Sequence, residues 1–322
     1  MENNNRDSNQ GREAGQVVYG DEIDLRELFL VIWAGKWIVL VGTAIATLIA
    51  VVIALSLPNV YRSEALLAPA SGEENSGLGS LASQYGGLAS LAGINLGGLG
   101  GGSSDKTTFG MEVLKSRKFI GDFVSKRQLL PSVMALEDWN LPGNELVFDD
   151  SIYDSETNTW TRNVDPPKQA EPSLLEAHEE FLELLDISQD ADTGLVKLSV
   201  ATYSPYLSKQ WVDWLVEDIN AEIRLQEVSE AEKSIAFLQN QLNATSLADM
   251  QTIFYQLIEE QTQTIMLANA RPEYLFRTVD PAVVAEEPTG PRRPLIALVG
   301  MLLGGFLSLL FVLCRHFFST KG

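Results

Sequence analysis

Residues 37–57 read WIVLVGTAIATLIAVVIALSL, and residues 295–313 read LIALVGMLLGGFLSLLFVL. Neither stretch contains a charged side chain, and each has about the 20 residues that an α-helix needs to cross the hydrocarbon core of a bilayer. Both are therefore predicted to be transmembrane helices. They lie near the two ends of a chain of 322 residues, so they leave short terminal segments and one long central region.

The central region carries nearly all of the net charge. Of 23 basic and 43 acidic side chains, 17 and 36 lie between residues 59 and 294, which gives that region a formal charge of −19. Such a region repels the phosphates of nucleic acids and anionic headgroups, so nucleic acid is not an expected partner. The single cysteine, Cys314, excludes an internal disulfide and a cysteine-based metal cluster.

Two segments precede the first apolar stretch. Residues 1–20 are rich in Asn, Gly and charged side chains and are predicted to form a disordered tail. Residues 21–36 place apolar side chains at helical spacing, so we expect a juxtamembrane amphipathic helix there. Trp33, Lys36 and Trp37 are residue types that favour the interface between membrane and water. This polar start is too long for a cleaved signal peptide, so the first apolar stretch is expected to be a retained anchor.

Residues 71–104 form a low-complexity segment dominated by Gly, Leu, Ala and Ser. This much glycine disfavours a packed helix or strand. Two interpretations are open, a mobile loop or a flexible apolar lining that touches a polymer or the membrane. The pattern GxxxxGK[ST] does not occur in the chain, so the glycines do not form a phosphate-binding loop.

The rest of the central region alternates helix and strand patterns. A strand is expected over 60–67, and a helix over 107–130 that ends before a proline. An acidic, turn-rich surface excursion over 137–172 comes next. It is followed by a short helix over 173–185 and by two strands joined by a turn over 186–202.

The most regular pattern begins with the Ser-Pro pair at 204–205, which suits the N-cap and the first position of a helix. Apolar side chains then recur every four residues and predict a helix over 205–242, about 57 Å long. A second helix over 247–269 makes residues 205–270 a long helix with a return helix. A strand over 273–279 is expected to lead back toward the membrane.

A helix of this length needs a well-packed base. Trp211, Trp214 and Leu215 lie near its start and bring large apolar side chains to that place. We therefore expect these three residues in the core of the base domain.

Small residues recur every four positions in both membrane stretches. Gly42, Ala46 and Ala50 form such a face in the first, and Gly300 and Gly304 in the second. Small faces allow close helix packing inside a bilayer, so we expect the second stretch to pack against the first of the same or a neighbouring subunit. The alternative is the ordinary content of small residues in membrane helices.

Residues 288–294 read PTGPRRP, with proline at every third position directly before the second membrane stretch. This spacing matches polyproline II, so a stiff rod that couples the central region to the membrane helix is one interpretation. A simple hinge is the other. The two arginines are suited to headgroup phosphates or acidic groups of a partner. The residues assigned to this coupling are Pro288, Pro291, Arg292, Arg293 and Pro294.

Patterns for catalysis or metal binding are weak. His178 lies in an acidic helix without a second histidine nearby, and a solvated helix face explains it better than a metal site. Asp186, Asp190 and Asp192 resemble a calcium loop only partly, since the twelfth-position glutamate is missing, and a hairpin turn is the better account. We therefore expect no catalytic, cofactor-binding or metal site, and no enzymatic activity.

The order of several segments resembles a known family, the bacterial chain length determinants of the Wzz type, which are polysaccharide co-polymerases. Each segment alone is weak evidence, but their order between two apolar stretches is specific. The segments are EIDLRELFLVIWAGKW (22–37), YRSEALLAP (61–69), EVLKSRKFI (112–120), GLVKLSVATYSPYLSKQWVDWLVEDIN (194–220) and PTGPRRPLIALVGMLLGG (288–305).

The resemblance implies an α+β membrane protein in which two transmembrane helices flank a periplasmic α/β base domain with a long projecting helix hairpin. It implies an inner-membrane location, with residues 58–294 in the periplasm and both termini, including the tail 314–322, in the cytoplasm. The implied assembly is a ring-shaped homo-oligomer with coiled-coil helices. The implied partners are a Wzy-type polymerase, undecaprenyl-linked polysaccharide and the lipid bilayer.

The resemblance further implies that the chain regulates the modal length of a surface polysaccharide, and lipopolysaccharide O-antigen is the expected product. A co-polymerase of an exopolysaccharide or capsule export system, with a separate tyrosine kinase, is the alternative. A periplasmic sensor is a third class, but the nine residues after 313 cannot form an output module. Basic residues near the membrane ends number four on each side, so charge alone does not decide the topology.

Overall fold

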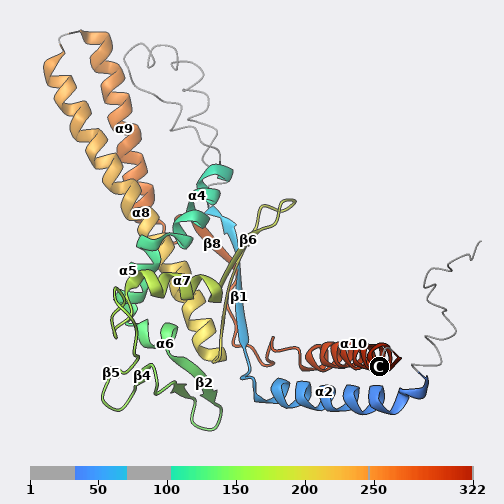
Figure 1. Cartoon of the computed structure of the whole chain (residues 1–322). Coiled ribbons are helices and arrows are strands. Elements are labelled where there is room, and N and C mark those ends of the chain that lie inside the picture. The colour runs from blue at the N-terminus through green and yellow to red at the C-terminus, as the bar shows by residue number, and fades with distance from the viewer. Residues whose placement is uncertain (1–32, 71–102, 246, 321–322) are drawn as a thin grey trace, which may run out of the picture. The chain divides into compact units, whose positions relative to one another are not determined.

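The computed structural model describes residues 33–70, 103–245 and 247–320, and it divides into two compact units (Figure 1). One unit is assigned residues 1–56 and 292–322, and the other residues 57–291. In the first unit, α2 (Lys36–Ser56) and α10 (Arg293–Thr320) pack against each other. Both helices are long and apolar enough to cross a membrane.

The second unit is built on a four-stranded antiparallel sheet with the strand order β6-β7-β1-β8. Its strands are β1 (Tyr61–Pro69), β6 (Leu185–Gln189), β7 (Val196–Thr202) and β8 (Phe276–Asp280). β1 pairs with a neighbour on each side, with Tyr61 opposite Thr202 of β7 and Pro69 opposite Phe276 of β8. The strand that follows the first membrane helix is thus a central strand of the sheet.

One face of this sheet is apolar and buried, as the alternation of side chains along a strand requires. The other face is polar, and Lys197 of β7 pairs there with Glu64 of β1 at 3.3 Å. The apolar face packs against helices and is formed by Ala65, Leu67, Val196, Leu198 and Val200.

Shorter helices complete the core, namely α4 (Ser103–Lys115), α5 (Arg117–Arg127), α6 (Leu130–Met134) and α7 (Leu174–Leu184). The prediction of one continuous helix over 107–130 is wrong, because the structure has two helices there, α4 and α5. The break lies at Ser116, whose side chain caps α5 by accepting a hydrogen bond from the Phe119 amide at 3.2 Å. Pro131, expected to end a helix, instead lies in the first turn of α6, where its missing N–H costs no hydrogen bond.

The acidic excursion contains two small hairpins. The first pairs β2 (Leu136–Asn140) with β3 (Glu145–Phe148), and the second pairs β4 (Tyr153–Asp154) with β5 (Thr159–Trp160). Tyr153 packs against Phe148 and Trp160, with ring centroids 5.8 and 4.9 Å apart. These aromatic contacts give the excursion a small apolar centre of its own.

The long helix α8 (Pro205–Ala244) and the return helix α9 (Ala248–Ala270) lie side by side as a hairpin (Figure 1). Ser204 caps α8 as its sequence predicts, by accepting a hydrogen bond from the Leu207 amide at 3.4 Å. Buried side chains are concentrated in the first half of α8, which packs on β1 and β7. The second half and α9 leave several apolar side chains exposed.

Asn220 joins α8 to the chain that returns from the hairpin. Its Oδ1 accepts hydrogen bonds from the amides of Leu275 and Phe276 at 2.7 and 2.9 Å, and its Nδ2 donates to the Phe276 carbonyl at 3.0 Å. Asn220 is buried, so these bonds replace the water that the amide groups would otherwise bind. The start of β8 is therefore fixed to α8 by a side chain.

The predicted fold class is confirmed, with two membrane helices flanking an α/β base that carries a long helix hairpin. Several predicted segments lie outside the described residues. These are the tail 1–20, residues 21–32 of the predicted juxtamembrane helix, and residues 71–102 of the glycine-rich segment.

Candidate functional site: membrane helix pair and sheet base

The predicted small faces of the two membrane helices meet within the chain. A methyl group added to Gly300 would overlap Cβ of Ala50, and one added to Gly304 would overlap Cβ of Ala46. Gly42 approaches the Ser308 side chain equally closely. The structure thus brings together the five residues that the sequence singled out for helix packing. Whether the same faces contribute to packing between subunits stays a prediction.

Polar groups in this helix pair are satisfied inside it. The hydroxyl of Thr43 donates to the Val39 carbonyl at 2.7 Å, and that of Ser308 donates to the Gly304 carbonyl at 2.7 Å. At one end, Nε of Arg293 donates to the Ala54 carbonyl at 3.1 Å. Hydrocarbon offers no partner for a polar group, so these bonds suit a bilayer environment.

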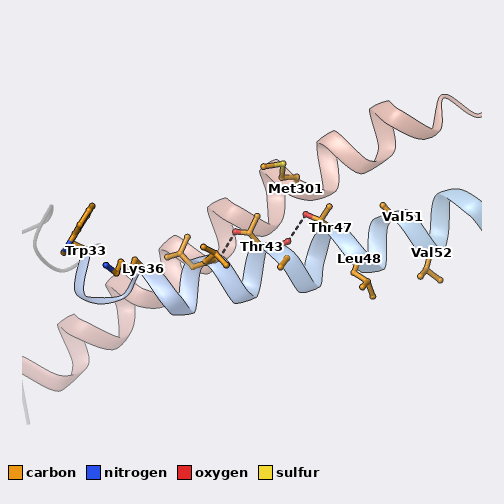
Figure 2. Close-up of a pocket in the computed structure, with 11 residues that line it drawn as sticks. Trp33, Lys36, Thr43, Thr47, Leu48, Val51, Val52 and Met301 are labelled. Atoms are coloured by element: carbon orange, nitrogen blue, oxygen red, sulfur yellow. Dashed lines mark hydrogen bonds between the residues drawn. The ribbon is translucent and has the colours of Figure 1, made fainter.

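A shallow groove of about 1080 Å³ runs along one side of α2. Figure 2 shows its lining, which is apolar along most of its length and receives Met301 from α10. Trp33 and Lys36 lie at one end, with the Lys36 amine 4.7 Å from the centre of the indole ring. In a bilayer, lipid chains fill such a surface.

The three residues expected in the base core differ in burial. Trp211 and Leu215 are fully buried, and the Trp211 ring stacks on Phe181 of α7 at 5.4 Å between centroids. Trp214 is only partly buried and lies at the edge of the core, where the Arg127 guanidinium sits 4.7 Å from its ring. α8 is therefore attached to the base through both a buried and a surface aromatic contact.

The chain enters and leaves the second unit at a common place. The Val60 amide donates to the Gly290 carbonyl at 2.9 Å, and the amides of Thr289 and Gly290 donate to the Val60 carbonyl at 2.8 and 3.3 Å. Val60 directly precedes β1, and Gly290 lies three residues before α10. We call this backbone bridge the neck, defined by Val60, Thr289 and Gly290.

The structure places the residues of the predicted proline segment in different surroundings. Thr289 and Gly290 are hydrogen-bonded to Val60, so this part of the segment is tied to the chain just before β1. Pro294 belongs to the first turn of α10, so the three proline rings do not share one extended segment. Pro288 and Pro291 flank the bridged residues, and Arg292 accepts hydrogen bonds at its carbonyl from the first turn of α10.

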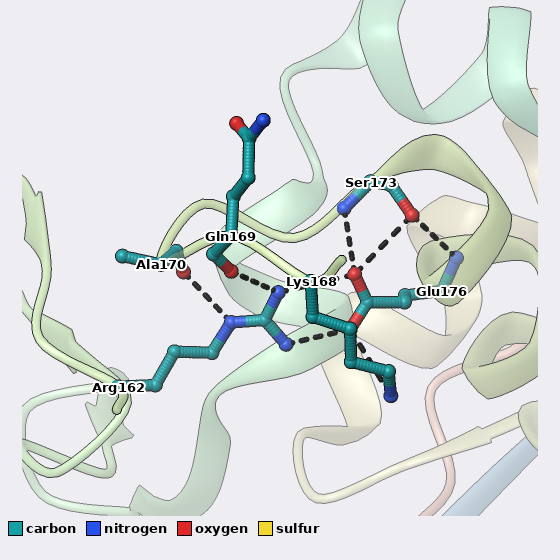
Figure 3. A network of polar contacts seen from close by, with 6 residues as sticks. All are labelled: Arg162, Lys168, Gln169, Ala170, Ser173 and Glu176. Carbon is teal, nitrogen blue, oxygen red and sulfur yellow. Dashed lines mark hydrogen bonds and ion pairs between the residues drawn. The ribbon is translucent and has the colours of Figure 1, made fainter. Parts of the chain in front are cut away.

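A separate network fixes the excursion to α7 (Figure 3). Arg162 and Glu176 form a two-pronged ion pair at 2.8 and 3.1 Å, and their side chains are only 13% and 12% exposed. Arg162 also donates to the carbonyls of Gln169 and Ala170, both at 2.7 Å. Hydrogen bonds from Arg162 lower the pKa of Glu176 to about 2, and the Ser173 amide adds to this effect.

Within residues 33–70, 103–245 and 247–320, no group of three or more His, Cys, Asp or Glu side chains is arranged to hold a metal ion. His178 Nε2 lies 2.9 Å from the Lys115 carbonyl, so this ring contributes to helix contacts. Asp190 accepts hydrogen bonds from the amides of Asp192 and Thr193 in the turn between β6 and β7. Gly194 completes this turn with φ +71°, so the segment 186–202 contains the predicted hairpin.

Sequence reasoning missed the residues that connect distant segments. The neck links positions 230 residues apart, and a Val or Gly in a loop carries no local signal for such pairing. The sequence around Arg162 likewise contains no pattern that predicts its ion pair with Glu176. A signal for its partner does exist, because Ser173 and Glu176 have the spacing of a capping box, which the structure contains.

Comparisons with known proteins give two family matches. Residues 21–127 match the family described as Wzz, chain length determinant protein, and residues 239–317 match the G-rich domain on putative tyrosine kinases. No curated protein matches the sequence.

Two solved structures are similar at low identity. A full-length bacterial polysaccharide co-polymerase is 12% identical over 93% of this chain and 99% of its own, with a TM-score of 0.37. A fragment of WzzB, a polysaccharide co-polymerase from Salmonella Typhimurium, is 11% identical over 72% of this chain and 99% of its own, with a TM-score of 0.28. These scores do not support comparison of individual side chains.

Proposed function

We propose that this chain is a polysaccharide co-polymerase of the Wzz type that determines chain length, and that its product is lipopolysaccharide O-antigen. In this proposal it acts with a Wzy-type polymerase on undecaprenyl-linked polysaccharide and catalyses no reaction itself. The observation that carries the proposal is the match of residues 21–127 to the chain length determinant family. The neck adds a physical route, because it joins the two connections between the membrane helices and the base at one point. Such a connection is suited to passing the shape of the base to the membrane helices.

The test is complementation of a strain that lacks the gene. Lipopolysaccharide from the deletion strain should lose its preferred length and show a random ladder on a gel. Expression of the chain should restore the preferred length. An unchanged ladder in the deletion strain would reject O-antigen as the product.

The match of residues 239–317 supports a second candidate. A G-rich domain of the kind found on putative tyrosine kinases favours an exopolysaccharide or capsule export system in which the kinase is a separate protein. In that case the deletion should reduce or shorten the exported polysaccharide and leave the lipopolysaccharide ladder unchanged. The same deletion strain thus distinguishes the two products.

The proposed orientation places residues 58–294 in the periplasm and both termini in the cytoplasm. Cys314 is the single cysteine and its side chain is exposed at the end of α10, which gives a natural reporter. A membrane-impermeant maleimide added to spheroplasts should leave Cys314 unlabelled until the membrane is broken. Ser155→Cys in a Cys314→Ser background should be labelled at once, because residue 155 lies in an exposed turn of the excursion. The reverse pattern would invert the topology.

The proposed assembly is a ring-shaped homo-oligomer. Large apolar side chains remain exposed on the helix hairpin and would be covered by neighbouring subunits. Mass measurement of the detergent-solubilised protein should give one closed oligomer, and Phe237→Glu should reduce its size if the hairpins pack together. The exposed residues include Leu225, Phe237, Leu247, Tyr255 and Met266.

The neck and the residues after it are proposed to transmit the shape of the base to α10. Pro291→Ala with Pro294→Ala removes two fixed φ angles and leaves the Val60 hydrogen bonds in place. We expect nearly normal folding and oligomerisation with a broader or shifted length distribution. A wild-type ladder at wild-type expression, checked by immunoblot, would show that this segment is only a connector.

A further inference from the structure

Three aromatic side chains from distant parts of the chain gather beside the first residue of β1. Trp139 of β2 packs edge-on against Tyr61 at 5.7 Å between ring centroids, and at 6.0 Å it meets Tyr206 in the first turn of α8. Tyr61 and Trp139 are half-buried, whereas Tyr206 is 51% exposed. We call Tyr61, Trp139 and Tyr206 the aromatic platform.

The platform is held rigidly. The Ser208 hydroxyl, two residues after Tyr206 on α8, donates to the Tyr61 carbonyl at 2.9 Å and so ties α8 to β1. The Trp139 indole N–H donates to Asn144 Oδ1 at 2.8 Å, which fixes the ring on its hairpin. A surface whose side chains are already ordered loses little entropy when it binds a ligand.

We propose that the aromatic platform binds a sugar residue of the polysaccharide. The apolar C–H face of a sugar ring packs well on an aromatic face, while its hydroxyls seek carboxylate and amide partners. Asn144, whose Oδ1 accepts the indole N–H of Trp139 at 2.8 Å, places such an amide beside this ring. This inference rests on the proposed function, because it takes the polysaccharide as the ligand.

Charge favours a sugar over an anionic lipid surface. Residues 136–160, which contain the hairpin of Trp139, carry seven acidic side chains and no basic one. This segment repels anionic headgroups and phosphates, which are weaker candidates for the same rings. A neutral, hydroxyl-rich ligand has no such penalty.

The place of the platform in the chain also suits a lipid-linked sugar polymer. Tyr61 follows Ser56, the last residue of α2, by five residues. Five residues span at most about 18 Å when fully extended, whatever the orientation of the two units. The platform therefore stays within reach of the membrane boundary, where a lipid-linked saccharide begins.

The test measures binding of delipidated surface polysaccharide, purified from the source strain, to the full chain in lipid nanodiscs by biolayer interferometry. Dextran and empty nanodiscs serve as controls. Tyr206→Ala removes the most exposed ring and should weaken binding about fivefold, the size of one aromatic contact. Phe109→Ala is the matched control, since Phe109 is a 50% exposed aromatic residue on α4, away from the platform in sequence and outside the helix hairpin. It should bind as the wild type does.

Trp139→Phe provides a second variant if Tyr206→Ala misfolds by circular dichroism. It keeps a ring but loses the bond to Asn144, and should weaken binding about twofold. Wild-type affinity in the folded variants, or no binding by the wild type, would overturn the proposal. A third result would also overturn it. If brominated phospholipid quenches the tryptophan fluorescence of the wild type more than that of Trp139→Phe, the indole of Trp139 lies against lipid.

The same variants separate this inference from the proposed function. If the wild-type chain restores the O-antigen length pattern but Tyr206→Ala binds polysaccharide normally, the platform proposal fails alone. If Tyr206→Ala loses binding but the wild-type chain has no effect on O-antigen length, the platform stands and the proposed product fails.

Discussion

Replacing Trp211 by Ala should lower the free energy of unfolding of the base by about 3–5 kcal/mol. The indole is fully buried and stacks on Phe181. A tryptophan buries about 150–250 Å², which corresponds to about 4–6 kcal/mol at about 25 cal/mol per Å². Alanine keeps part of this area, so the measured loss should fall at the lower end.

A second substitution tests the reasoning more finely. Among the described residues, Trp211 Nε1 has no hydrogen-bond partner, and a buried N–H without a partner costs about 1–3 kcal/mol. Trp211→Phe removes this group together with some apolar area. The two effects oppose each other, so we expect a net loss of about 1 kcal/mol or less.

The assay is thermal and urea unfolding of the full chain in detergent, followed by circular dichroism. For a unit of this size, Trp211→Ala should lower Tm by about 10 °C, and Trp211→Phe by about 3 °C or less. Phe109→Ala is the control for an exposed aromatic side chain. A Tm for Trp211→Ala equal to that of the wild type would remove this residue from the core. Equal losses for Ala and Phe would show that the N–H is satisfied by an ordered water.

Three further predictions concern other contacts of the structure. Gly300→Leu with Gly304→Leu should separate α2 from α10 and loosen the detergent-solubilised oligomer, and an intact oligomer with a normal length distribution would contradict this. The pKa of Glu176 is lowered from 4.5 to about 2 in the folded protein, so its pairing stabilises the fold by about 3 kcal/mol at pH 7 and this contribution disappears as the pH falls from about 4.5 to about 2. Glu176→Gln should therefore be clearly less stable than the wild type at pH 7, with a difference that narrows below pH 4.5 in urea unfolding, and a difference independent of pH would argue against the ion pair. Asn220→Ala leaves two amides and a carbonyl near β8 without their partner and should cost about 2–4 kcal/mol, measured by the same unfolding, while Asn220→Asp should recover part of the loss because its carboxylate still accepts from both amides.

Local signals in the sequence determined the separate elements. Two uncharged runs of 21 and 19 residues were sufficient to predict the membrane helices, because crossing a bilayer depends on length and composition alone. The start of α8 followed from Ser204 and Pro205, and its length from apolar residues at a spacing of four. Caps and periodicity act within a few residues, so they can be read without knowing the partner of the helix.

Only the tertiary structure decided which of these elements meet. The neck joins Val60 to Gly290, and the aromatic platform joins Tyr61 to Trp139 and Tyr206, across separations that no local pattern records. The break at Ser116 is a different case, because its cap is local and was missed only because the helix pattern continues through it. The contacts of the neck and the platform depend on which surfaces remain to be buried once the sheet and helices have formed, and that is a property of the whole fold.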